Sequence, residues 1–262
     1  MTLNLGIIIL LILLAFICEY IDSTLGMGYG TALAPILFLF GFKPLQIIPV
    51  ILLSEFITGL LAASLHHREG NVNLKFFKNG MSHHLKIALI LTTCSIIGTI
   101  TAVFIAVHIP KFWLQLYIGC LVFVMGIIIL ITLDKKYIFS WPKITLLGLT
   151  ASFNKGISGG GYGPIVTGGQ ILSGIESKNA IGITSLSESL TCFVGVMTYL
   201  LIVKNGIDWT LAPYIIIGAV IATPFSAKSI KRISIRNLKL AIATLTIFLG
   251  IITIVKTLSN LI

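Results

Sequence analysis

The stretch STLGMGYGTALAP, at 23–35, decides the fold because it places closely spaced glycines inside a strongly apolar sequence. Apolar runs at 5–18 and 28–42 flank or overlap it. A second stretch, GISGGGYGPIV at 156–166, carries the same G-x-G-Y-G pattern between the apolar runs 144–154 and 162–175. Neither stretch has the lysine that a phosphate-binding glycine loop places after its glycines. The two motifs therefore need another explanation.

The composition indicates an integral membrane protein. Hydrophobic residues make up 56% of the 262 residues and charged residues only 10%, whereas a soluble domain has about 25% charged residues. So little polar surface requires lipid as the solvent. The net charge of +10 comes from Lys and Arg in short loops between the apolar runs, and no basic arm or aromatic-interleaved patch suggests nucleic-acid binding.

Ten apolar runs predict the membrane segments. A helix needs about 20 apolar residues to cross the hydrocarbon core, and six runs are long enough or nearly so: 45–65, 87–107, 112–133, 179–203, 209–227 and 237–255. The runs 5–18 and 28–42, and the runs 144–154 and 162–175, are shorter, and a glycine motif joins each pair. We expect an all-α integral membrane fold in which each short pair is broken or re-entrant.

The positive residues predict the sidedness. Lys and Arg gather in three loops, at 66–86, 134–143 and 228–239, and the positive-inside rule places such loops in the cytoplasm. The numbers of crossings between these loops are even, which places both termini outside. The protein is therefore expected to pass through the membrane many times.

The two halves of the sequence repeat each other at an offset of 133 residues. From 26 to 58, eleven of 33 positions are identical without a gap, including the G-x-G-Y-G motif and a later Ser-Glu pair. Each half contains a short pair and three full spans. Because three is an odd number of crossings, the second half enters the membrane from the opposite face. We expect one membrane domain of two inverted-topology repeats, at 1–133 and 144–262, joined by a cytoplasmic linker at 134–143. Secondary transporters with this architecture bind substrate near the midplane, between the repeats.

The glycine motifs are the first candidates for a substrate site. Non-helical backbone is tolerated in the membrane only where protein or a water-filled cavity satisfies it. Helices that begin near Tyr29 and Tyr162 would point free N–H groups and the positive end of the helix dipole at an anion. Close glycine packing between helices is the alternative. The candidate substrate-binding residues are Gly26, Gly28, Tyr29, Gly30, Asn154, Lys155, Ser158, Gly159, Gly160, Gly161, Tyr162 and Gly163.

Ionisable residues inside the membrane are the candidates for ion coupling, because their burial is expensive. Glu55 and Glu188 are repeat mates close to mid-depth. They are expected to carry protons or, alternatively, to hold the unwound backbone. Asp22 and Lys155 precede the two motifs at equivalent positions. We expect them to form an ion pair, or Lys155 to contact an anion directly, with Asp22 as a third coupling residue. Glu19 has no acidic mate and ranks below these.

Four histidines bracket the loop at 66–86, namely His66, His67, His83 and His84. A solvated loop is favoured over a metal site there. We expect no metal and no cofactor.

The two glycine motifs, each followed by a Ser-Glu pair, resemble the sulfite exporter TauE/SafE family of membrane permeases. The resemblance covers essentially the whole chain. It implies a transporter of the cytoplasmic (plasma) membrane of a bacterium or archaeon, whose cargo is sulfite, an organosulfonate such as sulfoacetate, or another small sulfur-containing anion.

Two other functions are considered beside an exporter. A passive anion channel could use the same helix ends. An intramembrane serine hydrolase could use Ser158 in the sequence GISGG, but it needs a base at membrane depth, and no histidine lies inside an apolar run. We therefore expect a transporter and no enzyme. Its expected partners are a small anion and the lipid bilayer, and the sequence leaves a homo-oligomer open.

Overall fold

The chain folds into a bundle of helices. The computed structural model describes residues 4–77, 80–132, 140–204, 206–229 and 235–259, and these form ten helices and one β hairpin. In the hairpin, β1 (Phe76–Phe77) pairs antiparallel with β2 (Gly80–Met81). The helices are α1 (Leu5–Leu25), α2 (Tyr29–Leu39), α3 (Pro44–Arg68), α4 (His83–His108), α5 (Lys111–Ile131), α6 (Trp141–Ser158), α7 (Tyr162–Leu172), α8 (Ser177–Ile202), α9 (Ala212–Ser229) and α10 (Ile235–Ser259).

Each of the ten apolar runs corresponds to one helix, which confirms the all-α membrane fold. Within the described residues, six helices are long and apolar enough to cross a membrane. α1 is one of them, with 21 residues, although its apolar run was predicted to be short, and α9 contributes a shorter apolar segment at Ala212–Ser226. α1 is longer than predicted because the helix continues through Glu19 and Asp22, which end the apolar run, and stops only at Gly26, where φ is 68°.

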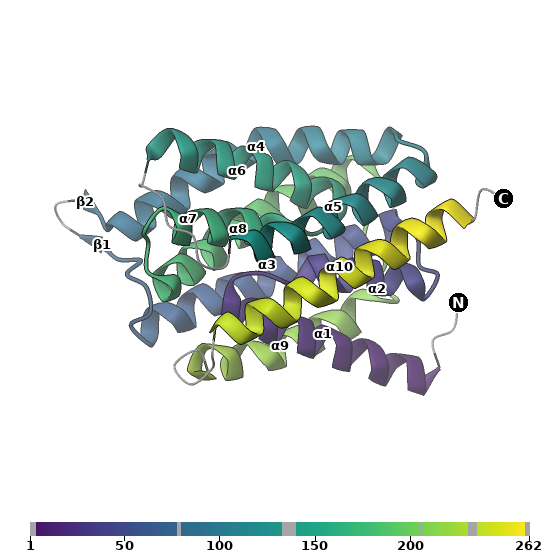
Figure 1. Cartoon of the computed structure of the whole chain (residues 1–262), viewed down its shortest axis with the longest axis horizontal. Coiled ribbons are helices and arrows are strands. Elements are labelled where there is room, and N and C mark those ends of the chain that lie inside the picture. Colours follow the sequence, from purple (N-terminus) through teal and green to yellow (C-terminus); the bar gives the residue numbers. More distant parts are fainter. Residues whose placement is uncertain (1–3, 78–79, 133–139, 205, 230–234, 260–262) are drawn as a thin grey trace.

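The helices run between two opposite ends of the bundle. α1 begins and α10 ends at one of them, the terminal end, and the β1–β2 hairpin lies at the other, the hairpin end (Figure 1). The Nζ of Lys256, near the end of α10, donates to the carbonyl oxygen of Leu39 at 2.9 Å. α2 therefore returns to the terminal end from which α1 starts. His83 and Trp141 are in ring contact, with centroids 5.6 Å apart, so α4 and α6 begin close together.

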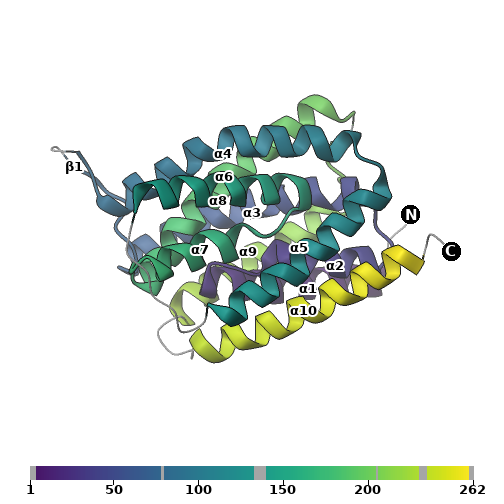
Figure 2. The same cartoon turned by 45° about the horizontal axis from the view of Figure 1, so that its top comes forward.

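The helix contacts come in matching pairs across the two halves of the chain. α1 packs on α9 as α6 packs on α4, and α3 packs on α9 as α8 packs on α4. The remaining major contacts join corresponding helices, α3 to α8 and α5 to α10, and Figure 2 shows α5 and α10 side by side. At the contact of α3 with α8, Ser189 Oγ donates to the carbonyl oxygen of Phe56, 133 residues away, at 2.6 Å. Such pairing is what two structurally equivalent halves would produce.

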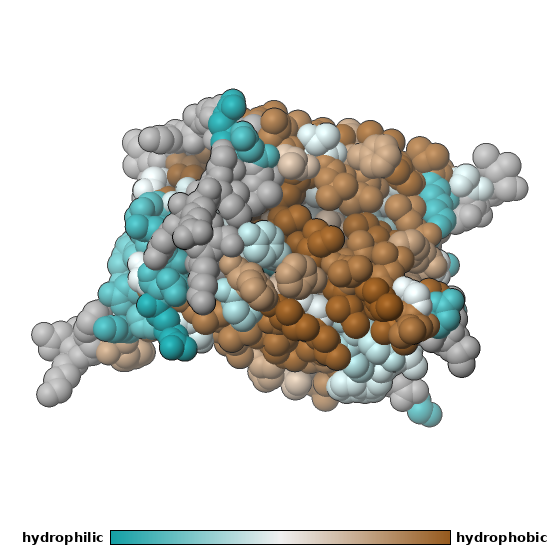
Figure 3. Space-filling view, turned by 90° about the horizontal axis from the view of Figure 1, so that it is seen from below, coloured by the Kyte–Doolittle hydropathy of each residue, from teal (hydrophilic) through white to brown (hydrophobic). Residues whose placement is uncertain are grey.

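The outer surface of the bundle is an apolar belt. Large hydrophobic side chains face outward along the helices, including Ile97, Leu146 and Phe248, which are 67%, 68% and 60% exposed. The space-filling view shows hydrophobic residues across the middle and hydrophilic residues toward both ends (Figure 3). Because soluble proteins rarely expose apolar patches of this extent, the belt is the surface that lipid covers. The predicted linker at 134–143 and the loop at 228–239 lie largely outside the described residues.

Candidate functional site

The two glycine motifs end one helix and begin the next in the same way. α1 ends at Gly26 and α6 at Gly159, with φ of 68° and 75°. α2 and α7 begin at Tyr29 and Tyr162, as the sequence predicted. Their N-cap residues are glycines with φ of 132° and 81°, in a region that side chains with a Cβ rarely adopt. The motifs therefore turn the chain back inside the bundle.

The two motifs also lie directly against each other, and we call this contact, between 26–30 and 159–163, the glycine crossing. A Cβ added to Gly30 would overlap the carbonyl oxygen of Gly159. A Cβ added to Gly163 would overlap the carbonyl oxygen of Gly26 in the equivalent place. The carbonyl of Gly26 accepts a hydrogen bond from Thr167 Oγ1 at 2.7 Å. Close glycine packing, which was the alternative explanation of the motifs, is thus part of their role.

The N-terminus of α2 is capped by an acidic residue of α1. The backbone N–H of Tyr29 donates to Asp22 Oδ1 at 3.0 Å, which places a carboxylate where the helix dipole stabilises it. The expected ion pair of Asp22 with Lys155 is not formed. Equivalence in the repeat does not bring the two residues together, because Asp22 caps α2 while Lys155 pairs with Glu55 and Glu188.

The N-terminus of α7 has no such cap. Its N-cap residue is Gly161, its first turn contains no acidic residue, and none of the described hydrogen bonds corresponds to that between the N–H of Tyr29 and Asp22. The residue equivalent to Asp22 is Lys155, which has no acceptor to offer these N–H groups. The two short helices are thus built alike, but Asp22 caps α2, and the equivalent residue in the second half, Lys155, is a cation.

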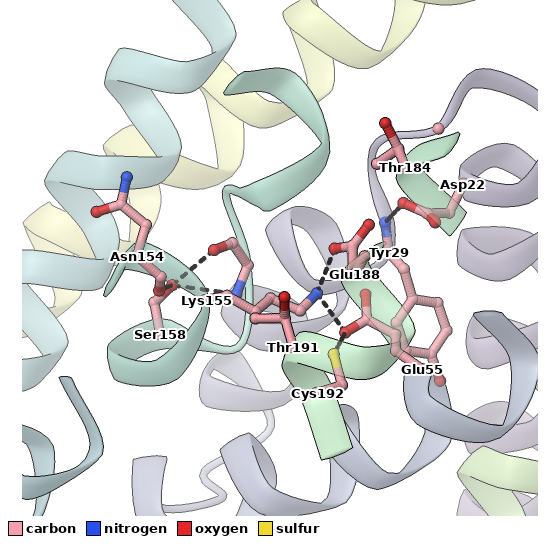
Figure 4. A network of polar contacts seen from close by, with 12 residues as sticks. Asp22, Tyr29, Glu55, Asn154, Lys155, Ser158, Thr184, Glu188, Thr191 and Cys192 are labelled. Carbon is pink, nitrogen blue, oxygen red and sulfur yellow. Dashed lines mark hydrogen bonds and ion pairs between the residues drawn. The ribbon is translucent and has the colours of Figure 1, made fainter. Parts of the chain in front are cut away.

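Lys155 is the one buried lysine or arginine in the described part of the chain, with 1% of its surface exposed. Its Nζ forms an ion pair with Glu55 Oε2 and donates to Glu188 Oε1 at 2.7 Å (Figure 4). The two glutamates come from the equivalent central helices α3 and α8 and are 4% and 6% exposed. Among the described hydrogen bonds, neither glutamate accepts from a backbone N–H, so they hold Lys155 rather than the unwound backbone.

Most of the other candidate side chains form hydrogen bonds within the protein, although the Tyr162 hydroxyl is buried without a partner among the described residues. Tyr29 and Tyr162 are fully buried, and the Tyr29 hydroxyl lies 2.8 Å from Ser54 Oγ. Asn154 Oδ1 accepts from the Tyr117 hydroxyl at 2.6 Å. Ser158 Oγ donates to the carbonyl oxygen of Asn154 at 2.6 Å and accepts from the Gly160 N–H at 3.0 Å. These bonds shape the second motif, and they give Ser158 no base.

Two small cavities lie beside the glycine crossing. The first, of about 10 Å³, has nine residues around it, and we call it the acidic cavity: Glu19, Asp22, Ser23, Glu55, Thr58, Gly59, Ala62, Ser185 and Glu188. The second, of about 20 Å³, is lined by Met27, Pro164 and Lys239 among others. A cavity of roughly 10–15 Å³ holds one water molecule, so neither admits a polyatomic anion as the helices now stand. Glu19, which the sequence ranked low, belongs to the first.

His66 corrects one prediction, because it lies in the buried last turn of α3 and not in a solvated loop. Its Nε2 is 2.9 Å from the carbonyl oxygen of Ser23. Its repeat mate Tyr199 donates to the carbonyl oxygen of Gly156, the mate of Ser23, at 3.0 Å. The sequence alone does not indicate these contacts, because the equivalent positions of the two repeats hold different residue types, histidine and tyrosine. Among the described residues, no group of His, Cys, Asp and Glu could hold a metal ion.

Comparison with known proteins identifies a family. The family model described as sulfite exporter TauE/SafE matches residues 11–253. A protein of Bacillus subtilis (strain 168), named "Probable membrane transporter protein YtnM", is 26% identical over 233 residues, which are 83% of this chain and 73% of that protein. No solved structure matches the chain. With nearly its whole length matched, the chain belongs to the TauE/SafE family of membrane transporters.

Proposed function

We propose that the chain is a secondary transporter that exports small sulfur-containing anions, such as sulfite or organosulfonates. The anion is not chemically altered, and its transport is coupled to that of protons. One observation carries this proposal: no described hydrogen bond joins an acidic side chain to the N-terminus of α7, as one does in α2, and the buried Lys155 lies in the last turn of α6, which leads into the motif before α7. Helix N-termini bind anions through free N–H groups and the helix dipole. A buried cation beside one makes the site selective for negative charge.

The two glutamates make anion binding depend on protons. Glu55 and Glu188 already occupy the Nζ of Lys155, so an incoming anion must compete with them. An ionised pair also repels the anion in a region where charges are poorly screened. Protons that neutralise the glutamates release Lys155 and remove the repulsion. Binding of the anion and binding of protons are therefore linked, and each raises the affinity for the other.

Transport requires movement, because the cavities beside the glycine crossing are about 10 and 20 Å³. We assign the movement to the two halves, 1–133 and 144–262, as inverted repeats connected by the linker at 134–143. The substrate site lies between them at the midplane, with Gly26, Gly28 and Gly30 on one side and Gly159, Gly160, Gly161 and Gly163 on the other. Rocking of one repeat against the other exposes such a site to each face in turn.

A passive anion channel is the second candidate, because the same helix ends would attract an anion in a fixed pore. Counterflow in liposomes separates the two. A carrier is accelerated by unlabelled anion on the far side, whereas a channel is not. Hydrolysis at Ser158 has no structural support, since its described hydrogen bonds go to backbone groups, and we propose no enzymatic activity.

Purified protein in liposomes is expected to move sulfite, thiosulfate or sulfoacetate faster than simple carboxylates, and a pH gradient is expected to drive this movement against a concentration gradient. Glu188→Gln is expected to keep exchange of labelled for unlabelled anion but to lose the response to the pH gradient. The reason is that an amide cannot give up a proton yet leaves Lys155 available. Uptake of labelled anion with and without a protonophore measures both effects.

Glu176→Gln is the matched control, because Glu176 is the N-cap residue of the same helix, α8, but its side chain is 59% exposed. It should behave as the wild type. The proposal is wrong if none of these anions moves, and its coupling scheme is wrong if Glu188→Gln responds to the pH gradient like the wild type.

The orientation is part of the proposal. The hairpin end carries the loop at 66–86 with its basic residues, so we place that end in the cytoplasm of a prokaryote and the terminal end outside. Alkaline phosphatase, which is active only outside the cytoplasm, should be active when it is fused after 262. Green fluorescent protein fused at the same position should not fluoresce, because the secretory pathway would carry it out of the cytoplasm. The reverse pattern would invert the topology.

A further inference from the structure

Glu19 is a buried acid that the ion pairs of Lys155 do not include. It lies on α1 with 2% of its surface exposed. Its Oε1 accepts a hydrogen bond from Ser23 Oγ at 2.5 Å, while its Oε2 is buried and has no partner in the described part of the chain. An unpaired polar atom at this depth leaves hydrogen-bonding capacity unused at a considerable free-energy cost.

A second unpartnered oxygen lies on the same cavity. Glu55 Oε1 is buried without a hydrogen-bond partner among the described residues, although Glu55 Oε2 pairs with Lys155. Both glutamates line the acidic cavity, whose volume of about 10 Å³ matches one water molecule. A water there would have the two to four polar partners that buried waters require, with the Thr58 hydroxyl also on the wall.

The charges around Glu19 disfavour its ionised form. Asp22, Glu55 and Glu188 face the same cavity and are also acidic. Lys155 is already shared by two of them, and His66 contacts the backbone of Ser23 rather than a carboxylate. α9, which packs along α1, has no acidic or basic residue between Ala212 and Ser226. Without a cation of its own, a buried carboxyl group is most stable when it is protonated.

We propose that the acidic cavity is a proton-binding site, at which Glu19 holds an exchangeable proton that it passes to Glu55 through one water molecule. In this step the O–H bond of Glu19 breaks and its proton joins the water oxygen. The water in turn gives a different proton to Glu55 Oε1. Glu19 becomes a carboxylate, Glu55 becomes neutral, and the water is unchanged.

The exposure of the residues around the cavity is consistent with proton entry near Asp22 and transfer from Glu19 to Glu55. Asp22, on its wall, is only partly buried, while Glu19 and Glu55 are enclosed. The inference rests on the proposed function in one respect: the proton that reaches Glu55 is the one that releases Lys155 for the anion. Occupation of Glu19 by a proton does not depend on which solute is transported.

Infrared difference spectroscopy of the purified protein in lipid tests the proposal directly. The wild type should show a carbonyl stretching band of a protonated carboxyl group that shifts in heavy water, and Glu19→Gln should lose it. Ser23→Ala should keep this band but move it to higher frequency, because the carbonyl loses the hydrogen bond that Ser23 donates. Glu176→Gln, at an exposed position, should leave the band unchanged. Glu55→Gln should shift the Glu19 band by altering the acceptor across the water.

A Glu19→Gln spectrum that retains every carboxyl band at its wild-type area would overturn the proposal. Should this variant fail to fold, an unshifted band in Ser23→Ala would overturn it equally. The transport measurement is separate. If liposomes move no anion while the Glu19 band is present, the proposed function fails and the proton site stands. If anions move but the Glu19 band is absent, the proton site fails and the proposed function stands.

Discussion

Replacement of Lys155 by methionine is expected to abolish transport of the anion in liposomes. Methionine fills a similar volume without charge, so the variant removes the cation and leaves the packing of α6 largely intact. Loss of one partner from a buried charge pair reduces binding by about 2–5 kcal/mol, which corresponds to at least roughly 30-fold in affinity. Initial rates of uptake over a range of anion concentrations measure this loss.

The same variant is also expected to be less stable. Glu55 and Glu188 lose the ammonium group that both contact, and breaking a buried ion pair on one side costs about 3–5 kcal/mol. The triple variant Lys155→Met, Glu55→Gln, Glu188→Gln should regain much of the stability, because no charge is left uncompensated, but it should not regain transport. Thermal unfolding in detergent measures the first effect and uptake the second.

Lys178→Met provides the control for Lys155→Met. Lys178 lies in α8, its side chain is 47% exposed, and it pairs only with the exposed Glu176. Exposed pairs contribute about 0–1 kcal/mol, so stability and transport should both be preserved. Wild-type uptake by Lys155→Met would remove Lys155 from the substrate site and, with it, the observation on which the proposed function rests.

Gly163→Ala is expected to destabilise the protein strongly. The added Cβ would overlap the carbonyl oxygen of Gly26 and lie 2.6 Å from the Cα of Met27. Overpacking typically costs about 1–3 kcal/mol, and these neighbours are backbone atoms that cannot rotate away. We therefore expect a loss at or above the upper end of this range. Chemical unfolding of the purified protein, followed by helix content, measures it.

Gly168→Ala is the matched control, since it makes the same change in the same helix. No atom lies within 4 Å of the added Cβ, and the backbone there is ordinary helix. Alanine exceeds glycine in helix propensity by about 1 kcal/mol, so this variant should be as stable as the wild type or more so. Equal unfolding of the two variants would mean that the glycine crossing does not hold the two motifs together. Gly30→Ala, whose Cβ would overlap the carbonyl oxygen of Gly159, should repeat the result in the first half.

The helices and the glycine motifs were predictable because their signals are local. An apolar run of sufficient length must be helical in lipid, where the backbone has no water to bond. The G-x-G-Y-G pattern also located the starts of α2 and α7, because glycine tolerates the backbone angles that precede them. The end of α1 could not be predicted from the apolar run alone. Glu19 and Asp22 interrupt the hydrophobic run, but they face the interior of the protein rather than lipid.

The partners of the charged residues could not be predicted. Lys155 was expected to pair with Asp22 because the two are equivalent in the repeat. Its actual partners come from α3 and α8, which meet at the centre of the bundle. His66 shows the same limitation, since its neighbour Ser23 is 43 residues away. Which side chains meet depends on how the helices cross, and hydrophobic patterns do not encode crossing positions.

The sequence by itself determined that the chain is a membrane protein of helices with two related glycine motifs, because composition, hydropathy and an ungapped repeat are properties of the chain alone. Only the tertiary structure decided that the motifs touch, that Asp22 caps α2 while α7 has no acidic cap, and that Lys155 is shared by Glu55 and Glu188. The physical reason is that a charged side chain buried inside a membrane protein must pair with a residue of another helix. The packing of the helices determines which residue that is.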